Sequence, residues 1–407
     1  MKKIVCGFFV MMGLLAFSQK GNTVEEDKDL RFSVLPYYNF GKGVGMTSPD
    51  SIFQLNIRFR MQNRATYINE EGAEEDEINA EIRRLRLRFD GYVGDPRFLY
   101  AIQLSFSPGD TGGSIEEGDN LQIIRDAVVF YQPNKNWTFG FGQTKLPGNR
   151  QRTNSSGALQ FTDRTINNAS FNIDRDFGFQ IQNLNEFKDK FSYNFKGAIT
   201  TGEGRNDTKN SDTGLAYTGK VELYPLGAFT KNGSFFEGDL ARESKPKLMI
   251  SGAYSFNNKA TKTQGQLGEK LFEQKDITSL FLDAMLKYNG WALQTAYMSR
   301  MADNPISYNP DDNTDISYVY VGSGMDYQLS YLFPSNYELL GRYSTQNMHK
   351  DVQNFTPDKR QYSVGVTKYF WEHAFKMQAE VTFDELNYVN GDTQNNWYVR
   401  FQIEMGI

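Results

Sequence analysis

Cysteine and histidine are almost missing from this chain of 407 residues, which has one cysteine and two histidines. Cys6 lies in an apolar run at the N-terminus, so no disulfide is available to the rest of the chain. With no histidine pair at ligand spacing, neither a metal centre nor another cofactor is expected. A hydrolase needs a nucleophile beside a base, and neither His349 nor His373 has a GxSxG-like serine nearby. These absences argue against an enzyme.

Long apolar runs are also missing beyond the N-terminus, where no stretch approaches the roughly 20 residues that a membrane helix needs. Apolar residues make up only 39% of the chain, whereas aromatic residues reach 14% and glycine occurs 36 times. The formal net charge of −5 argues against nucleic acid as a partner. This composition suits a sheet with one apolar and one wet face, and the length suits one large closed barrel.

The N-terminus predicts export. Lys2 and Lys3 precede the apolar run at residues 4–17, and Ala16 and Ser18 place small residues at the −3 and −1 positions of a cleavage site. We therefore expect a signal peptide at residues 1–18 and a periplasmic N-terminal segment at 19–50. Residues 51–407 then form a β-barrel domain in the outer membrane of a Gram-negative cell.

Segments of about ten residues alternate apolar and polar side chains, as strands do between lipid and water. Near the start, the apolar residues Phe53, Leu55, Ile57, Phe59 and Met61 alternate with Gln54, Asn56, Arg58, Arg60 and Gln62. The same criterion predicts sixteen antiparallel strands, at 52–67, 78–93, 97–107, 122–132, 136–145, 176–184, 190–201, 214–225, 247–256, 276–288, 290–301, 316–333, 336–345, 359–371, 374–384 and 396–406. An even number of strands allows the barrel to close with both termini of the chain on the same side of the membrane.

The connections between these strands alternate in length, as in outer-membrane barrels with long extracellular loops and short periplasmic turns. The long ones lie at 68–77, 108–121, 146–175, 202–213, 257–275, 302–315, 346–358 and 385–395. Trp137, Trp291 and Trp371 flank tight turns, where they indicate a periplasmic aromatic girdle, with ordinary core burial as the alternative. One turn, at 226–246, is long, and is interpreted as a flexible insertion or, alternatively, a docking element.

Arginines on the first two expected strands carry the chemistry. If these strands pair as a hairpin, Arg84, Arg86 and Arg88 share the lumenal wall with Arg58, Arg60 and Arg64. Six like charges repel one another, so either an anion in transit or acids such as Glu338, Glu380 and Glu404 must compensate. The second case gives a transverse field in a weakly selective pore. Arg83 is out of phase and is expected to face lipopolysaccharide phosphates.

The connection at 146–175 is too long for a simple cap. It carries Arg150, Arg152 and Arg164 among polar residues, and we expect it to fold inward and narrow the channel, a solvated surface loop being the alternative. The acidic run at 70–77 is interpreted as a solvated loop tip.

Several blocks of the sequence resemble the phosphate-selective porins (porins O and P) of Gram-negative outer membranes. The blocks are FQLNIRFR at 53–60, residues 83–91, RDAVVFY at 125–131, FGQTKLPG at 141–148 and residues 164–179. The later half is similar only in strand rhythm. The resemblance implies a sixteen-stranded barrel, usually a homotrimer, with basic residues along the lumen and an inward-folded third loop. It implies an anion-binding role for Arg58, Arg60, Arg84, Arg86, Arg88 and Lys145, and more loosely for Arg150, Arg152 and Arg164.

Together these features predict passive diffusion of small anions, with phosphate or similar oxyanions as the best candidates, through an arginine-lined lumen. The expected partners are outer-membrane lipid, lipopolysaccharide and small anionic solutes. Two alternatives remain at this point, a general and weakly selective porin, and a structural or secretion-associated barrel. Conductance in a planar bilayer separates a channel from a scaffold.

Overall fold

The computed structural model describes residues 43–111, 122–187, 189–207 and 213–407. The expected signal peptide and most of the expected segment at 19–50 lie outside this part of the chain. The barrel strands are β2 (Phe53–Glu70), β3 (Glu77–Val93), β4 (Phe98–Ser105), β5 (Ile124–Tyr131), β6 (Trp137–Lys145), β7 (Arg175–Asn185), β8 (Ser192–Thr200), β9 (Ala216–Tyr224), β10 (Lys247–Lys262), β11 (Lys270–Tyr288), β12 (Trp291–Met301), β15 (Gly322–Leu332), β16 (Tyr337–Met348), β17 (Asp358–Trp371), β18 (Phe375–Asn387) and β19 (Thr393–Gly406).

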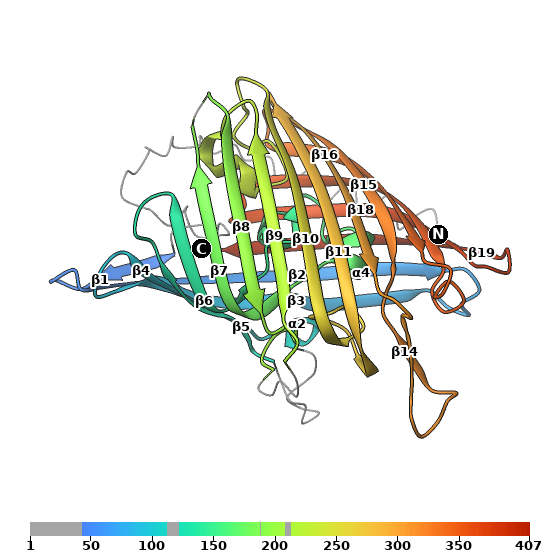
Figure 1. Cartoon of the computed structure of the whole chain (residues 1–407). Coiled ribbons are helices and arrows are strands. Elements are labelled where there is room, and N and C mark those ends of the chain that lie inside the picture. The colour runs from blue at the N-terminus through green and yellow to red at the C-terminus, as the bar shows by residue number, and fades with distance from the viewer. Residues whose placement is uncertain (1–42, 112–121, 188, 208–212) are drawn as a thin grey trace. The chain divides into compact units, whose positions relative to one another are not determined.

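Each barrel strand pairs antiparallel with the next along the chain, as Figure 1 shows for the labelled strands. The barrel closes where β19 pairs with β2, from Asn396 opposite Glu70 to Gly406 opposite Arg60. Every strand expected from the alternation has a counterpart. The prediction of a closed antiparallel barrel of sixteen strands is therefore confirmed.

The burial pattern of the strands is that of a barrel with an apolar outside and a polar inside. In β17, for example, Val364 is 62% exposed while its neighbour Ser363 is 3% exposed. The three tryptophans beside tight turns are not core residues, since Trp137, Trp291 and Trp371 are 39%, 52% and 64% exposed. Among the described residues, no helix has both the length and the apolar character needed to cross a membrane.

The structure differs from the expected strands in three places. A short strand, β1 (Val44–Thr47), pairs with Gln54–Ile57 of β2. The strand expected at 316–333 is two strands, because β14 (Ile316–Tyr318) leaves the barrel to pair with β13 (Ile306–Tyr308) and only β15 continues the wall. The connections at 71–76, 263–269 and 388–392 are shorter than expected, because polar strand ends continue to pair beyond the alternating part.

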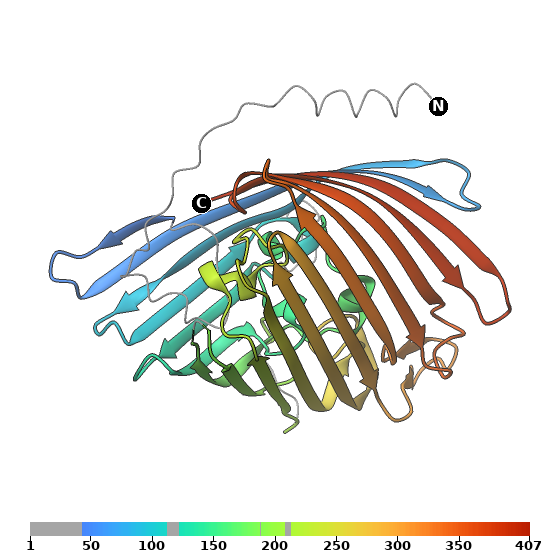
Figure 2. The same cartoon turned by 90° about the horizontal axis from the view of Figure 1, so that it is seen from above.

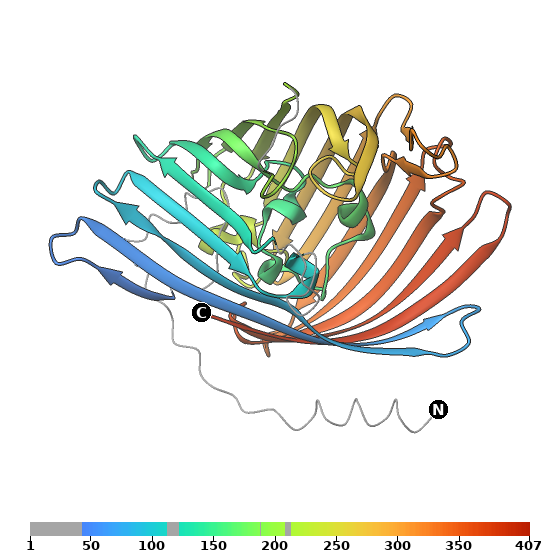
Figure 3. The same cartoon turned by 90° about the horizontal axis from the view of Figure 1, so that it is seen from below.

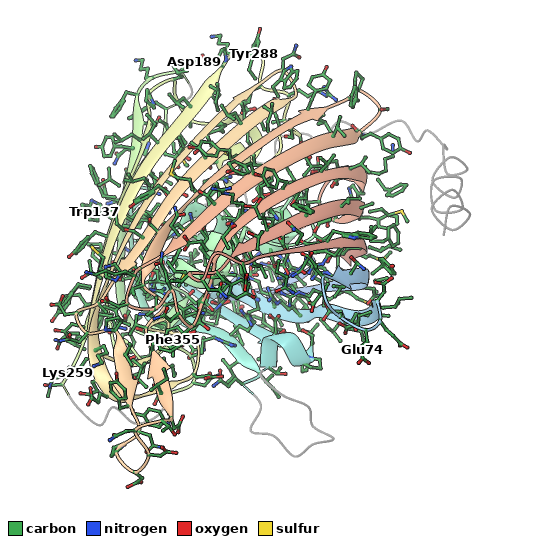
Figure 4. All side chains as sticks on the ribbon, turned by 90° about the vertical axis from the view of Figure 1, so that its right-hand side faces the viewer. Glu74, Trp137, Asp189, Lys259, Tyr288 and Phe355 are labelled. Carbon is green, nitrogen blue, oxygen red and sulfur yellow. The ribbon has the colours of Figure 1, made fainter. Side chains whose placement is uncertain are left out.

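Tight turns gather at one end of the barrel and the other connections at the opposite end. In Figure 4, Asp189 and Tyr288, from two turns of the first kind, lie together at the upper end, whereas Lys259 and Phe355 lie at the lower end. Two connections enter the lumen from these opposite ends. We call residues 146–174, between β6 and β7, the third loop, and residues 225–246, between β9 and β10, the long turn.

The third loop contains α3 (Arg150–Thr153), η3 (Ser156–Ala158) and α4 (Ile166–Phe171). Figures 2 and 3 look into the barrel from its two sides, and in both this green segment lies inside the ring of strands. Its two ends are packed on the wall by an apolar cluster in which Leu146, Phe171 and Ile173 meet Phe281 and Met298. The polar middle of the loop is thereby left to contact the polar inner face of the barrel.

The long turn contains η4 (Thr230–Phe235) and is anchored by an apolar cluster of Tyr224, Phe229, Met249 and Met285. Its acidic residues Glu237, Asp239 and Glu243 are all buried. A segment this closely packed is not the flexible insertion that the sequence suggested, because its polar groups find their partners inside the barrel.

Candidate functional site

A wall of arginines lines the lumen on β2 and β3. Antiparallel pairing sets Arg58 opposite Arg88 and Arg60 opposite Arg86, while apolar neighbours such as Phe59 and Leu87 lie opposite each other on the outer face. Directly opposed like charges on adjacent strands destabilise a sheet unless something negative lies nearby. The wall therefore needs anionic partners, from the protein or from a solute.

A cavity of about 60 Å³ lies between this wall and the third loop. Its lining residues are Arg58, Phe59, Arg60, Arg86, Arg88, Gln103, Lys145, Ser155, Ser156, Arg175, His373, Ala374, Gly406 and Ile407. Six of these are cations, and within this lining set no side chain is acidic. We call this space the basic cavity.

Two serine hydroxyls of the third loop face the arginines. Arg60 donates to the Oγ atoms of Ser155 and Ser156 at 3.0 and 2.6 Å, and Arg86 donates to Ser156 Oγ at 3.3 Å. Ser155 also caps η3, since its Oγ accepts from the backbone N–H of Gly157 at 3.2 Å. The cap holds both hydroxyls at the edge of the cavity, where they join the guanidinium groups as hydrogen-bonding partners.

Carboxylates pair with the arginines of the cavity but do not balance their positive charge. Asp90 lies 3.4 Å from Arg58 and 3.1 Å from Arg88, and Glu404 lies 3.7 Å from Arg60. Asp110 pairs with Arg86, and Arg175 pairs with Asp126 at 3.0 Å and with Asp174 at 3.3 Å. Three of these five acids are shared with further cations, Asp110 with Arg125, Glu404 with Lys376 and Asp174 with Arg152. The cavity therefore keeps an excess of positive charge, which attracts small anions.

Three arginines of the same wall are removed from the cavity by one carboxylate of the third loop, Asp163. It lies 3.3 Å from Arg64, 3.0 Å from Arg83 and 3.4 Å from Arg84. Burial disfavours the ionised carboxyl, but Arg84, Arg83 and Arg64 outweigh this effect and hold the pKa of Asp163 well below its usual range. Asp163 is thus an ionised clamp between the loop and the wall.

Arg83 does not lie where the sequence predicted it, facing lipopolysaccharide. The pairing between β2 and β3 shifts register between Gln62 and Asn63, so Arg83 is an extra residue in β3. Such a bulge breaks the alternation and turns two neighbouring side chains the same way. Arg83 therefore reaches Asp163 in the lumen and does not face lipopolysaccharide.

The arginines of the third loop do not line the basic cavity. Arg150 donates to Gln294 at 2.8 Å and to the backbone of the long turn, on the opposite side of the loop. Arg152 pairs with Asp174 at 2.8 Å, and Arg164 donates to the carbonyl of Gln151 at 2.8 Å. Arg152 and Arg164 thus hold the fold of the loop, whereas Arg150 joins the loop to the wall and to the long turn.

The acids of the far wall bind the third loop through neutral donors. Glu380 accepts from the N–H and the hydroxyl of Thr162, both at 2.9 Å. Glu338 accepts from Gln160 at 2.6 Å, and the same pattern links Asp326 to Thr165 and Asn167 and Asp283 to Asn149 and the N–H of Arg150. Since the third loop covers these carboxylates, and Glu404 lies beside Arg60, the expected acidic wall across an open pore is not present.

Alternation could not have found Lys145 and Arg175 as cavity residues. Gly142 has a φ of +130°, and a Cβ there would lie 2.3 Å from the carbonyl oxygen of Ala127. Beyond this glycine the regular exchange of exposed and buried residues in β6 ends, and Lys145, opposite Arg175, reaches the lumen. For Ser155 and Ser156, the sequence offered only one indication of a role in the cavity, which is that two adjacent hydroxyl residues lie in a loop that carries arginines.

Comparison with known proteins agrees with this geometry. Among solved structures, the chain resembles the outer-membrane channel DcaP of Acinetobacter baumannii (14% identity, TM-score 0.55, 89% of this chain and 100% of that one). It also resembles an anion-selective porin from Comamonas acidovorans (12%, 0.53, 87% and 100%) and Salmonella typhi OmpF in complex with daunomycin (13%, 0.54, 88% and 100%). At these identities the likeness concerns the fold.

No curated protein sequence matches the chain significantly. A family model described as phosphate-selective porin O and P matches residues 53–396, which is nearly the whole barrel. The chain is therefore an outer-membrane porin, and it belongs to the phosphate-selective porin O and P family.

Proposed function

We propose that this porin allows passive diffusion of small anions, and of oxyanions such as phosphate in particular, through the basic cavity. The observation that carries the proposal is the cavity lining, with six cations, two serine hydroxyls and no acidic side chain among its residues. The anion-selective porin from Comamonas acidovorans shares the fold and supports this choice.

The chemistry of the lining suits a tetrahedral oxyanion. Guanidinium groups stay charged at physiological pH and can donate two parallel hydrogen bonds to two oxygens of one anion. Arg60 and Arg86 are paired across β2 and β3 and already converge on Ser156. An entering anion supplies negative charge where the cavity lining has no acidic side chain. Each cation of the lining also lies near a carboxylate of the protein, so the anion binds weakly enough to be released.

The decisive experiment reverses the charge of Arg60 and Arg86 together. In a planar bilayer with a salt gradient, we expect the wild-type reversal potential to indicate anion preference and inorganic phosphate to reduce the chloride current. In the double variant Arg60→Glu, Arg86→Glu, the reversal potential should move to the cation side and the phosphate block should be lost.

The matched control is Arg97→Glu, the same reversal at an exposed arginine in the turn after β3 that pairs with Asp95. Unchanged selectivity in the folded double variant would contradict the proposal. The general, weakly selective porin would then be favoured, because carboxylates of the protein lie beside Arg58, Arg60, Arg86 and Arg88 and would neutralise their charge. A wild-type protein without conductance would favour a structural or secretion-associated barrel.

We also propose that the tight turns face the periplasm and that the mature protein, exported by residues 1–18, forms a homotrimer surrounded by lipid and lipopolysaccharide. Trp137, Trp291 and Trp371 support this orientation, because each is exposed and lies at a strand end beside a tight turn. A membrane-impermeant maleimide added to whole cells should label a Glu74→Cys variant and spare Asp189→Cys; the reverse would invert the orientation. Crosslinking of the purified protein tests the trimer.

A further inference from the structure

The long turn enters the lumen from the end of the barrel opposite to the third loop. The two segments meet directly, as the N–H of Glu237 donates to the carbonyl of Ala158 at 3.3 Å. In Figure 2 the yellow-green segment with η4 lies within the ring of strands beside the green third loop. Turns at the tight-turn end of a barrel normally stay at the rim, so a turn that reaches the third loop needs a reason.

A lysine of the barrel wall holds the long turn through all three of its N–H donors. Lys287 of β11 donates to the carbonyls of Gly233, Phe236 and Gly238 at 2.7, 3.0 and 2.7 Å. An ammonium group has three N–H donors, so all of them are spent on this segment. The carbonyls of a peptide segment that three charge-assisted bonds orient in this way are fixed in position.

The third loop holds the other side of the same segment. Glu237 accepts from Gln151 at 2.8 Å and from the N–H of Gln160 at 2.8 Å. The contact is so close at Gly238 that a Cβ there would lie 2.6 Å from Glu338 Oε1. At Glu237 and Gly238 the long turn is therefore in direct contact with both the third loop and the wall.

The tip of the long turn reaches the edge of the basic cavity. The ring of Phe236 stacks on the ring of His373, with centroids 4.8 Å apart and planes within 11°. His373 lies in the turn between β17 and β18 and lines the basic cavity. The long turn therefore extends from β9 and β10 across the lumen, and its tip lies at the edge of the basic cavity.

We infer that the long turn is a fixed barrier that fills the lumen beside the basic cavity, so that solutes cross the barrel only through that cavity. The inference rests on the proposed conduction of solutes but is independent of the anion preference. It assigns to the turn a role in selectivity, because a sixteen-stranded barrel without such filling encloses a wide aqueous channel. An open second path would carry ions past the arginines without contact.

The test replaces residues 226–246 with an Asn-Gly turn, which joins antiparallel strands in two residues. Single-channel conductance should rise roughly twofold or more, because the freed lumen becomes an aqueous channel. The reversal potential in a salt gradient should fall toward zero. Proteoliposomes should also admit neutral sugars that the wild type excludes. Unchanged conductance and selectivity in a folded variant, judged by the heat-dependent shift in its gel migration, would overturn the inference.

A smaller change decides the matter if the shortened protein does not fold. Phe236→Ala removes the ring beside His373 and should raise conductance and admit larger solutes, whereas Phe187→Ala, at an exposed ring on the same rim, should change neither. Equal behaviour of the two variants would overturn the inference in that case. A silent wild type with a conducting Asn-Gly variant would support the barrier while contradicting passive diffusion, so the two proposals fail separately.

Discussion

The third loop is held by arginines on the side of β2 and β3, whereas on the side of β16 and β18 the carboxylates Glu338 and Glu380 hold it together with basic donors such as Arg342 and Lys376. The first side uses ion pairs, in which Arg64, Arg83 and Arg84 share Asp163. On the second side the carboxylates accept hydrogen bonds from neutral donors of the loop, as in the two bonds from Thr162 to Glu380. The loop therefore meets the arginines with a carboxylate and meets the carboxylates with neutral groups.

The difference shows how a chain with more acids than bases can keep a basic cavity. Neutral loop donors cover the far-wall carboxylates, so these acids are withdrawn from the solute path without using the cations of the basic cavity; Glu380 also lies 3.8 Å from Arg400. Buried groups that lose their hydrogen-bonding partners cost about 1–3 kcal/mol each. The near-wall ion pairs share Asp163, whose side chain is 25% exposed, and solvent weakens such pairs. We therefore expect the far wall to hold the loop more firmly, and the near wall to tune the charge.

The largest effect should follow from weakening the attachment of the loop at the far wall. The double variant Glu338→Ala, Glu380→Ala leaves the donors of Thr162 and one of the two amide donors of Gln160 without acceptors, and should destabilise the protein by about 2–6 kcal/mol. We expect larger and noisier single-channel currents together with a lower denaturation midpoint. The control, Glu338→Gln with Glu380→Gln, keeps a carbonyl acceptor at each site and should resemble the wild type; equal loss in both pairs would show that charge, not hydrogen bonding, holds this side.

A second and smaller effect should follow from Asp163→Asn at the near wall. Loss of the charge leaves three guanidinium groups without their shared counter-ion, so the lumen becomes more positive. The reversal potential should shift further toward anion preference, while the loop stays attached through Glu338 and Glu380. A shift toward cations, or none, would mean that these arginines do not act on the permeating ion.

The hydroxyl of Ser156 should have a modest effect confined to the solute. Ser156→Ala removes one hydrogen-bonding partner at the cavity, worth about 1 kcal/mol, so phosphate should block chloride current roughly fivefold less strongly. Ser335→Ala, at an exposed serine in the turn between β15 and β16, is the matched control. Equal phosphate block in both variants would place the solute elsewhere in the lumen.

The smallest effect concerns pH. A carboxyl whose pKa is lower in the folded than in the unfolded protein contributes stability above its unfolded pKa and loses it as the pH falls through the folded pKa. Because the pKa of Asp163 lies well below its usual range, the clamp should persist unchanged from neutral pH down to about pH 4. A selectivity change between pH 7 and pH 5 that disappears in Asp163→Asn would contradict this assignment.

The sequence predicted the barrel wall because strand alternation is a local property. The inward direction of Arg58, Arg60, Arg86 and Arg88 follows from residues that are neighbours in the chain, and it needs no knowledge of the rest of the fold. The same reasoning failed at Arg83, where a bulge changes the phase. Lys145 was indicated by the family resemblance alone, because a glycine with positive φ changes the phase of β6 before it. Both irregularities depend on pairing with a second strand, which the sequence of one strand does not contain.

The amino-acid sequence by itself determined that this protein is a closed barrel of sixteen strands with arginines on one inner wall, because a two-residue period records which face meets lipid. Only the tertiary structure decided which charges remain available to a solute. Asp163 meets Arg64 across about a hundred residues of sequence, and Glu237 and Gln160 meet from opposite ends of the barrel. Such pairings arise because two polar segments must satisfy their hydrogen bonds inside a common lumen, and no local pattern specifies which partner each will find.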